Sequence, residues 1–259
     1  MGKLHPLLIK DERMKELGNT KRVKMKPVDE KKNAQWKEEE FNFNAILGTD
    51  HPEELLKRAH PFLELMMQYE CALMEVKTKL KVLNKEFALR HSRNPFEAIE
   101  SRIKEPLSIV EKLKRKGLPI SVESIEKNLF DIAGIRVVCS FPEDIYNIAE
   151  LLIKQDDIIL VEEKDYIKNP KENGYRSLHL ILDIPIFLAE EKKHMKVEVQ
   201  LRTIAMDFWA SLDHKLKYKK NVKNSDEISK ELKQCADAIC EMDLRMQEIR
   251  NKIENNGTE

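Results

Sequence analysis

The sequence is poor in glycine and has no long apolar run. Only seven of its 259 residues are glycine, and Gly117, Gly134 and Gly174 alone lie between residues 51 and 250. We expect each of these three to mark a place where the backbone is geometrically constrained. No apolar run approaches the ~20 residues of a membrane-spanning helix, and the N-terminus lacks the apolar stretch and cleavage site of a signal peptide. We therefore expect a cytoplasmic protein without membrane contact.

Cysteine is scarce and the charge is balanced. The four cysteines, Cys71, Cys139, Cys235 and Cys240, form no CxxC pair, which argues against a zinc site or a disulfide framework and favours reduced thiols. The 46 basic and 46 acidic residues give a formal net charge of zero, so broad electrostatic capture of nucleic acid or anionic lipid is not expected. Any anion site must be local. Apolar residues, at 41%, still suffice for the core of one large domain.

The first 48 residues form a basic N-terminal extension. Through Lys37 they carry eleven Lys or Arg residues against five Asp or Glu, and their apolar positions lack a sustained period. We interpret residues 1–48 as a mobile arm. A solvated tail is the commoner meaning of such a charge run, and a contact with RNA is the alternative.

Two segments after this extension have helical spacing. Between Glu53 and Arg90 apolar residues recur at steps of three and four, which predicts one helix, or two if Pro61 divides it. A further helix is predicted from Asn94 to Lys116, ended by Gly117. The N-terminal part of the domain should therefore be helical.

The sequence then changes to short segments rich in β-branched residues. The predicted strands are Ile132–Phe141, Ile158–Glu162, Tyr175–Ile184 and Met195–Arg202, with a helix at Pro142–Gln155. Strands separated by a helix and a loop, and enclosed by long helices, predict an α+β fold with a mixed β-sheet flanked by N- and C-terminal helices. We expect this domain to span residues 49–222.

The C-terminal residues 223–259 carry a heptad pattern. After a predicted helix at Met206–Tyr218, eight apolar residues from Ile228 to Ile253 follow at alternating steps of four and three. Such a stripe either docks on its own domain or mediates self-association. We interpret residues 223–259 as an oligomerisation helix.

The strand predicted at Met195–Arg202 has two unlike faces. One carries apolar side chains and the other polar ones, namely Val197, Val199 and Leu201 against Lys196, Glu198, Gln200 and Arg202. A solvated outer face is the usual meaning. Flanking helices would instead make it the floor of a cleft, where Glu198 is a metal ligand or a base. Asp131 either caps a turn or pairs with Glu198 to hold Mg²⁺, which takes one or two carboxylates with phosphate oxygens and waters.

Cations are spaced along the predicted helix at residues 94–116. Lys104, Ser108, Lys112 and Arg115 fall at steps of four, four and three, so three cations and a hydroxyl share one stripe. A solvated basic face is one reading. A polyphosphate site is the other, because Lys and Arg offer many donors to phosphate oxygens.

An aromatic residue follows a lysine-rich loop. The loop at residues 164–174 carries Lys164 and Lys171 ahead of Tyr175, at the entrance of a predicted strand. Tyr175 is either an ordinary strand aromatic or a platform on which a base stacks. His179, on the same predicted face, is read as a hydrogen-bonded framework residue. Two carboxylates, a cationic stripe and a stacking aromatic are what a metal-dependent enzyme for nucleoside polyphosphates requires.

Five ordered motifs resemble the synthetase domain of the RelA/SpoT family, in particular the stand-alone small alarmone synthetases. They are SRIKEPLSIVEKLKRKG (101–117), DIAGIRVVCSF (131–141), NGYRSLHL (173–180), VEVQLRT (197–203) and FWASLDHKLKYK (208–219). The resemblance covers about residues 70–250. It implies a nucleotidyltransferase-like fold that transfers the β,γ-pyrophosphate of ATP to the 3′-hydroxyl of GDP or GTP. The products would be AMP and (p)ppGpp, the alarmone of the stringent response, and GMP stays open as a further acceptor.

The resemblance also implies residue roles at the matching positions. ATP would be held by Arg102, Lys104, Lys112 and Arg115, with Ser108 and Arg136 nearby. Mg²⁺ would be coordinated by Asp131 and Glu198, and Glu198 would be the base for the 3′-hydroxyl. The catalytic set is therefore Glu198, Asp131, Arg102 and Lys104. The acceptor guanine would stack on Tyr175, with Asn173, His179, Gln200 and Ala210 around it and Lys164 and Lys171 on its phosphates.

The family also implies partners, and this sequence departs from it in places. The family often forms homotetramers, and Lys77 and Lys81 match lysines that bind an allosteric alarmone in one branch, but the accompanying aromatic is Ala98 here. The usual Glu before His214 is Asp213. No His-Asp dipeptide of the family's hydrolase domain is present. Two alternatives stay open: pyrophosphorylation of tRNA 3′ ends, and a catalytically inactive regulator that binds RNA or nucleotide.

Overall fold

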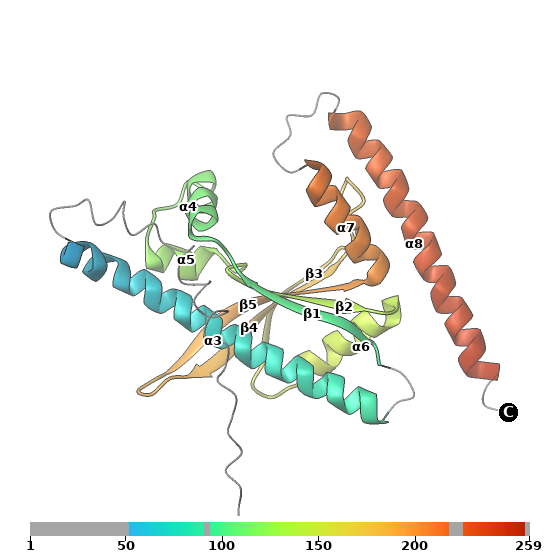
Figure 1. The fold of residues 1–259 in the computed structure, drawn as a ribbon, viewed down its shortest axis with the longest axis horizontal. Coiled ribbons are helices and arrows are strands. Elements are labelled where there is room, and N and C mark those ends of the chain that lie inside the picture. Colours follow the sequence, from blue (N-terminus) through green and yellow to red (C-terminus); the bar gives the residue numbers. More distant parts are fainter. Residues whose placement is uncertain (1–51, 91–93, 218–224, 257–259) are drawn as a thin grey trace, which may run out of the picture. The chain divides into compact units, whose positions relative to one another are not determined.

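The computed structural model describes residues 52–90, 94–217 and 225–256 (Figure 1). The chain divides into two compact units, residues 1–56 and 57–259, and the features below belong to the second. The predicted basic arm lies outside the described residues. Among the helices of the described segments, none combines the length and the apolar character needed to cross a membrane.

Five strands form one mixed sheet in the order β1-β2-β5-β4-β3. Its strands are β1 (Phe96–Ile103), β2 (Ala133–Cys139), β3 (Ile159–Asp165), β4 (Leu178–Phe187) and β5 (Lys192–Thr203). Strands β2 and β5 are parallel, whereas the other neighbours are antiparallel. The predicted mixed sheet is therefore confirmed.

Helices precede and follow the strands of this sheet in the sequence, as predicted. They are α3 (Pro52–Arg90), α4 (Pro106–Arg115), α5 (Val122–Asn128), α6 (Pro142–Ile153), α7 (Ile204–Lys217) and α8 (Ser225–Asn256). Helix α3 continues through Pro61, so the alternative of two helices there is wrong.

The predicted helix at residues 94–116 is wrong in its first half. Residues 96–103 form β1, which pairs with β2, and Pro106 starts α4 in its first turn. Ile99 and Ile103 pack against the core. Their four-residue separation suits one face of a strand as well as one face of a helix, so the spacing alone did not distinguish the two.

The hydrophobic core lies between one face of the sheet and helices α3 and α6. Figure 1 shows α3 running across the sheet. The predicted apolar face of β5 is fully buried: Val197, Val199 and Leu201 each have 0% exposure. They share one core cluster with Leu80 of α3 and Ile148 of α6. The opposite face of the sheet is left for polar side chains.

Two of the three central glycines adopt the constrained backbone that was predicted. Gly117 has φ +66° and Gly174 has φ +89°, in the left-handed region that favours glycine. Gly134 lies inside β2 without a positive φ, and a Cβ there would meet Arg102 at an ordinary 3.6 Å. The expectation of a constrained backbone is therefore wrong for Gly134.

Candidate functional site

Two rows of side chains cross the polar face of the sheet in register. Residues paired across neighbouring strands point to the same face. One row is Glu162, Ile181, Glu198, Gly134 and Arg102, and the other is Lys164, His179, Gln200, Arg136 and Glu100. Six residues predicted from the sequence for the site therefore share one face, although they come from all five strands.

Asp131 precedes β2 and faces two lysines. Its Oδ2 accepts hydrogen bonds from the Nζ atoms of Lys104 and Lys112, both at 2.5 Å. Burial disfavours the charged form, but the two lysines outweigh it, so the pKa of the Asp131 carboxyl lies below its ordinary value. The Oδ1 atom is buried and has no hydrogen-bond partner. Asp131 is therefore an ionised carboxylate with one oxygen unused.

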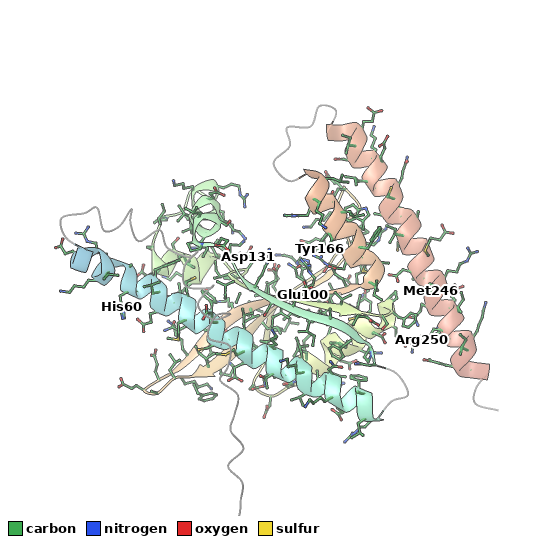
Figure 2. All side chains as sticks on the ribbon, in the orientation of Figure 1. His60, Glu100, Asp131, Tyr166, Met246 and Arg250 are labelled. Atoms are coloured by element: carbon green, nitrogen blue, oxygen red, sulfur yellow. The ribbon has the colours of Figure 1, made fainter. Side chains whose placement is uncertain are left out.

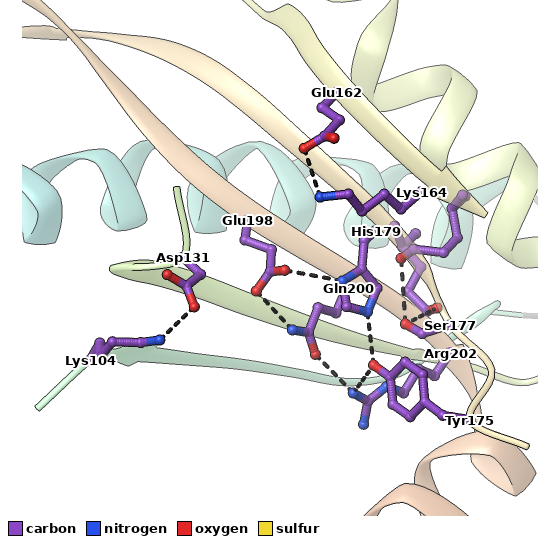
Figure 3. A network of polar contacts seen from close by, with 12 residues as sticks. Lys104, Asp131, Glu162, Lys164, Tyr175, Ser177, His179, Glu198, Gln200 and Arg202 are labelled. Carbon is purple, nitrogen blue, oxygen red and sulfur yellow. Dashed lines mark hydrogen bonds and ion pairs between the residues drawn. The ribbon is translucent and has the colours of Figure 1, made fainter. Parts of the chain in front are cut away.

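Glu198 lies on β5 between Val197 and Val199, so its side chain points to the face opposite the core. Its Oε1 lies 3.0 Å from Nδ1 of His179, and its Oε2 accepts a hydrogen bond of 2.8 Å from Nε2 of Gln200 (Figure 3). Burial disfavours its charge, but these two contacts outweigh it and hold the pKa of the Glu198 carboxyl below its ordinary value. Glu198 is therefore a second ionised carboxylate on the same face.

The oxygen chemistry of these two carboxylates fits Mg²⁺, but they would be an incomplete ligand set for it. The charge of Asp131 acts on Glu198, and Glu198 is in register with Gly134, three residues beyond Asp131. The orphaned Oδ1 of Asp131 offers an oxygen ligand. Within the described segments, no group of three or more His, Cys, Asp or Glu could hold a metal ion. Phosphate oxygens and water would have to complete the shell, as is usual for Mg²⁺.

The predicted cationic stripe is not a single helical stripe. Lys104 lies between β1 and α4, and only Ser108, Lys112 and Arg115 are on α4. Lys104 still reaches Asp131 beside Lys112, because the chain from β1 passes close to the start of β2: the backbone N–H of Lys104 donates to the carbonyl of Ile132 at 2.8 Å. Ser108 and Arg115 are exposed on the helix surface.

A cavity of about 720 Å³ opens at Gln200, the hydrogen-bond partner of Glu198, and neither carboxylate lines it. Its size lies within the range of small-molecule sites, about 300–1,000 Å³. It is lined from β1, β2, β5 and α7 by residues that include the predicted Arg102, Arg136, Tyr175, Gln200 and Ala210. A smaller cavity shares Arg102, Arg136 and Gln200 with it. Two of the cations predicted for nucleotide binding, Arg102 and Arg136, and the predicted aromatic residue Tyr175 thus face a common space.

Tyr175 lies in the loop before β4 and not in a strand, because β4 begins at Leu178. The loop is tied by its own contacts: the backbone N–H of Tyr175 donates to Oδ1 of Asn173. The Asn173 amide in turn donates to Asp213 on α7 at 3.4 Å. The Nζ atom of Lys171 is 4.7 Å from the centre of the Tyr175 ring. Tyr175, Asn173 and Lys171 are therefore together at the edge of the cavity.

Lys164 lies on β3 and points to the same polar face. It donates to Glu162 at 2.9 Å, and this contact is the main cause that raises the pKa of Lys164, with a smaller contribution from Glu198. Of the residues predicted from the family motifs, Arg102, Arg136, Tyr175, Gln200 and Ala210 line the two cavities described. The others line neither cavity: Lys104, Ser108, Lys112, Arg115, Asp131, Lys164, Lys171, Asn173, His179 and Glu198.

Some cavity residues were not predicted for the site. These are Arg202 on β5 and Ser211, His214 and Lys215 on α7. The alternation of β5 already put Arg202 on the polar face beside Glu198 and Gln200, which was the one usable signal. The α7 residues depend on how that helix docks, and sequence spacing does not contain that information.

The chain is similar to proteins of known family. The model described as the region found in RelA / SpoT proteins matches residues 101–223. The chain is 40% identical to GTP pyrophosphokinase YwaC of Bacillus subtilis (strain 168) over 208 residues, which is 80% of this chain and 99% of that protein.

Two solved structures of the small alarmone synthetase 1 from Bacillus subtilis are also similar. The one bound to its product pppGpp has a TM-score of 0.69 and 35% identity, and the match covers 74% of this chain and 97% of that one. The one bound to AMPCPP has a TM-score of 0.63 and 34% identity, covering 77% and 99%. The resemblance and the α+β fold expected from the sequence are thereby confirmed. The near full-length similarity shows that the chain belongs to the RelA/SpoT family of GTP pyrophosphokinases.

Proposed function

We propose that this protein transfers the β,γ-pyrophosphate of ATP to the 3′-hydroxyl of GDP or GTP with the help of Mg²⁺. The observation that carries the proposal is the pair of ionised carboxylates on one face, Asp131 with an unused oxygen and Glu198 between two donors. Relatives solved with pppGpp and with AMPCPP support nucleotides as substrates.

Separate residues serve the two nucleotides in this proposal. Lys104, Lys112, Arg102 and Arg136 hold ATP, while the acceptor base stacks on Tyr175 at the edge of the 720 Å³ cavity. Such stacking contributes about 1–3 kcal/mol per base in nucleic-acid complexes. Lys171 and Lys164 are on the acceptor side, where they meet its phosphates.

In the transfer step, the 3′-oxygen of the acceptor bonds to the β-phosphorus of ATP, and Glu198 accepts the proton of that hydroxyl. The bond from that phosphorus to the oxygen bridging it to the α-phosphate breaks, and AMP leaves with the bond electrons. Arg102 and Arg136 counter the charge that develops on the phosphate oxygens. Mg²⁺, held by Asp131 and Glu198, would supply further neutralisation and orientation of the phosphates.

Replacing Glu198 by Gln tests the reaction. The substitution keeps the shape but removes the negative charge and the base, so we expect turnover to fall by about two to four orders of magnitude while the fold survives. The assay mixes protein, Mg²⁺ and ATP with GDP, GTP or GMP and separates the nucleotides by anion exchange.

Glu143→Gln is the matched control. Glu143 is a carboxylate on α6 whose partners are Gln247 and Arg250 of α8, outside the cavity. It should retain full turnover. Normal turnover in the Glu198 variant removes that residue from the mechanism. Absence of AMP and product with every acceptor refutes the proposed function, and labelling of added tRNA instead identifies RNA as the acceptor.

We also propose that the active form is a homo-oligomer, with the tetramer as the favoured size. Helix α8 exposes apolar residues of its predicted heptad: Met242 is 67% exposed, Met246 52% and Ile253 67%. A row of this kind buries itself when helices of several copies associate.

A further inference from the structure

Five side chains on the polar face form a closed ring of hydrogen bonds. One arm of the ring runs from Arg202 through Tyr175 and His179 to Glu198, and the other runs from Arg202 through Gln200 to Glu198 (Figure 3). The contacts of the first arm are 2.6, 2.8 and 3.0 Å long. Those of the second are 2.9 and 2.8 Å. The ring links the proposed guanine platform to the proposed base.

The charged groups at the two ends fix the direction of the bonds in the first arm. A guanidinium only donates, so the Tyr175 oxygen accepts from Nη2 of Arg202. The ionised carboxylate of Glu198 only accepts, so Nδ1 of His179 donates to it. With its ring proton on Nδ1, His179 accepts the hydroxyl proton of Tyr175 at Nε2.

The second arm is directed in the same way. The Oε1 atom of Gln200 accepts from Nη2 of Arg202, so the amide nitrogen of Gln200 faces Glu198 and donates to it. Both arms therefore end as N–H donors on the two oxygens of one carboxylate. A reversal at either arm would place two acceptors against each other, which is costly at a buried site.

Arg202 is held firmly enough to direct the bonds that it donates. Its side chain is only 6% exposed, and its Nη1 donates to Oδ1 of Asp207 at 3.0 Å. Its Cζ lies 5.1 Å from the centre of the Tyr175 ring. Because Arg202 stays charged and its fork is planar, it presents two Nη2 protons at fixed angles to Tyr175 and Gln200.

We propose that Arg202 is a positioning residue for the acceptor side of the reaction. Through the ring it holds the Tyr175 ring at the cavity edge for the acceptor base, and together with the Glu198 carboxylate it orients His179 and Gln200, which both donate to Glu198. This inference rests on the proposed function, because it gives the guanine platform and the base a common anchor. Arg202 is not among the residues to which the family resemblance assigned a role.

The test measures binding of each nucleotide by itself in Arg202→Met. Removing hydrogen bonds from a charged donor should weaken GDP binding by about 10- to 100-fold. Binding of a non-hydrolysable ATP analogue should weaken clearly less than GDP binding. Arg202 shares the partner Asp207 with Arg136, a residue proposed for ATP, whose Nε lies 3.4 Å from Asp207, whereas Tyr175 itself is a member of the ring. Arg202→Lys, which keeps the charge but not the fork, should recover part of the GDP affinity.

A spectroscopic measurement reads the ring directly. Long-range proton–nitrogen spectra of protein labelled with ¹⁵N-histidine distinguish the two neutral tautomers, and His179→Gln assigns the signal of His179. At pH 8 we expect His179 to be the Nδ1–H tautomer in the wild type, with Nε2 accepting from Tyr175. In Arg202→Met we expect the Nε2 resonance to shift, because the Tyr175 hydroxyl loses the donor that holds it on Nε2. An Nε2–H tautomer or a doubly protonated ring in the wild type overturns the inference.

Tyr175→Phe and Arg250→Met separate positioning from simple loss of stability. If Arg202 acts through the Tyr175 hydroxyl, the loss of GDP affinity in the double variant Arg202→Met/Tyr175→Phe should be smaller than the sum of the losses in Arg202→Met and Tyr175→Phe. Arg250 is another largely buried arginine, with 15% of its side chain exposed, and it pairs with Glu143 outside the cavity. The Arg250→Met variant should bind GDP normally. An additive double variant, or equal loss of both nucleotides in Arg202→Met, overturns the inference.

These readouts do not depend on turnover. A wild type that makes no AMP yet shows the expected tautomer and GDP binding contradicts the proposed function and leaves the inference standing. An active wild type whose Arg202→Met variant binds GDP normally contradicts the inference alone.

Discussion

The two carboxylates of the site differ in what surrounds them. Asp131 is compensated by the charges of Lys104 and Lys112 and keeps one oxygen unused. Glu198 receives an N–H donor on each oxygen from residues that lie on its own strand and the next. The first arrangement suits a ligand for a cation that arrives with phosphate, and the second suits a base held in one orientation.

Acid should weaken the contribution of Asp131 to stability. Its native pKa is lowered, so its ionised form stabilises the fold above the unfolded value, about 3.9, and this contribution is lost as the pH falls through the native value. In Asp131→Asn the carboxylate is absent and the two lysines face each other. The difference in free energy of unfolding between wild type and variant should therefore shrink from pH 7 to pH 3.

Urea unfolding at a series of pH values measures this difference. A constant difference over the whole range contradicts the lysine-paired, ionised state of Asp131. Glu123→Gln is a comparison at an exposed helix start. The backbone and Ser121 also lower the pKa of that carboxyl, so its difference in free energy of unfolding should shrink in the same direction, whereas the proposed reaction should be unchanged.

For single residues, the sequence indicated which residue types belong to the site but not which side chains bond one another. Asp131, Glu198 and Tyr175 stood out by position next to strands and loops. In the structure Tyr175 is linked to Glu198 through His179, and the charge of Asp131 acts on Glu198. That Lys104 bonds Asp131 could not be predicted, because Lys104 was expected on a helix. The ring through Arg202 depends on the cross-strand pairing of His179 with Gln200, which alternation within one strand does not specify.

Helix α8 contacts the proposed acceptor loop. The loop carrying Tyr175 packs on α8, where Arg176 pairs with Asp237 at 3.0 Å and also donates to the carbonyl of Ala236 at 3.4 Å. Gly174 touches the same helix: a Cβ there would lie 2.5 Å from that of Ala236 and 3.1 Å from Cα of Lys233. The C-terminal helix therefore helps to place Tyr175, although it lies outside the matched family region.

Gly174→Ala should disturb acceptor binding. The substitution combines the strain of φ +89° with a collision against α8, so the loop or the helix has to move. Gly117→Ala is a matched control, because it has φ +66° but open space around the added Cβ.

We expect both glycine variants to lose about 1–2 kcal/mol through backbone strain, and Gly174→Ala to lose more through the collision. Only Gly174→Ala should raise the KM for GDP, by about tenfold or more if the loop loses a stacking contact. Thermal unfolding and initial-rate kinetics measure the two effects. Equal KM values for GDP in the two variants contradict the role of α8.

Element types were predicted best where one period was sustained. The strand β5 alternates over its central residues, and the long helix α3 repeats at three and four, so both were recognised. Strand β1 was not, since Ile99 and Ile103 satisfy both periods. Its identity is decided by pairing with β2, a contact between segments some 35 residues apart in sequence, as in the pair Glu100 and Arg136.

For the molecule as a whole, α8 has two distinct faces. One face docks: Asp243 is buried and accepts a hydrogen bond from Thr203, and the carbonyl of Leu232 accepts one from Trp209. The predicted heptad is offset from this face, so Met242 and Met246 are exposed. Docking and self-association were posed as alternatives from the sequence, yet the helix has a residue for each: Asp243 is buried, whereas Met246, labelled on α8 in Figure 2, is 52% exposed.

Two charges on the exposed row should dissociate the proposed oligomer. Met242→Glu combined with Met246→Glu places like charges in an apolar contact, where they are costly to bury. Sedimentation velocity should show the wild type as an oligomer and this variant as a smaller species. Gln234→Glu, an added charge at an exposed position off the row, should leave the wild-type size. A wild type that sediments as a monomer contradicts the oligomer proposal.

The most direct test of the central claim is the stoichiometry of the products. Wild-type protein is incubated with Mg²⁺, ATP and GDP, and the nucleotides are quantified by anion exchange. Transfer of the β,γ-pyrophosphate predicts one AMP for each 3′-pyrophosphorylated guanosine nucleotide, and almost none of either from Glu198→Gln. Formation of ADP in place of AMP, or equal yields from the Glu198 variant, would contradict the account.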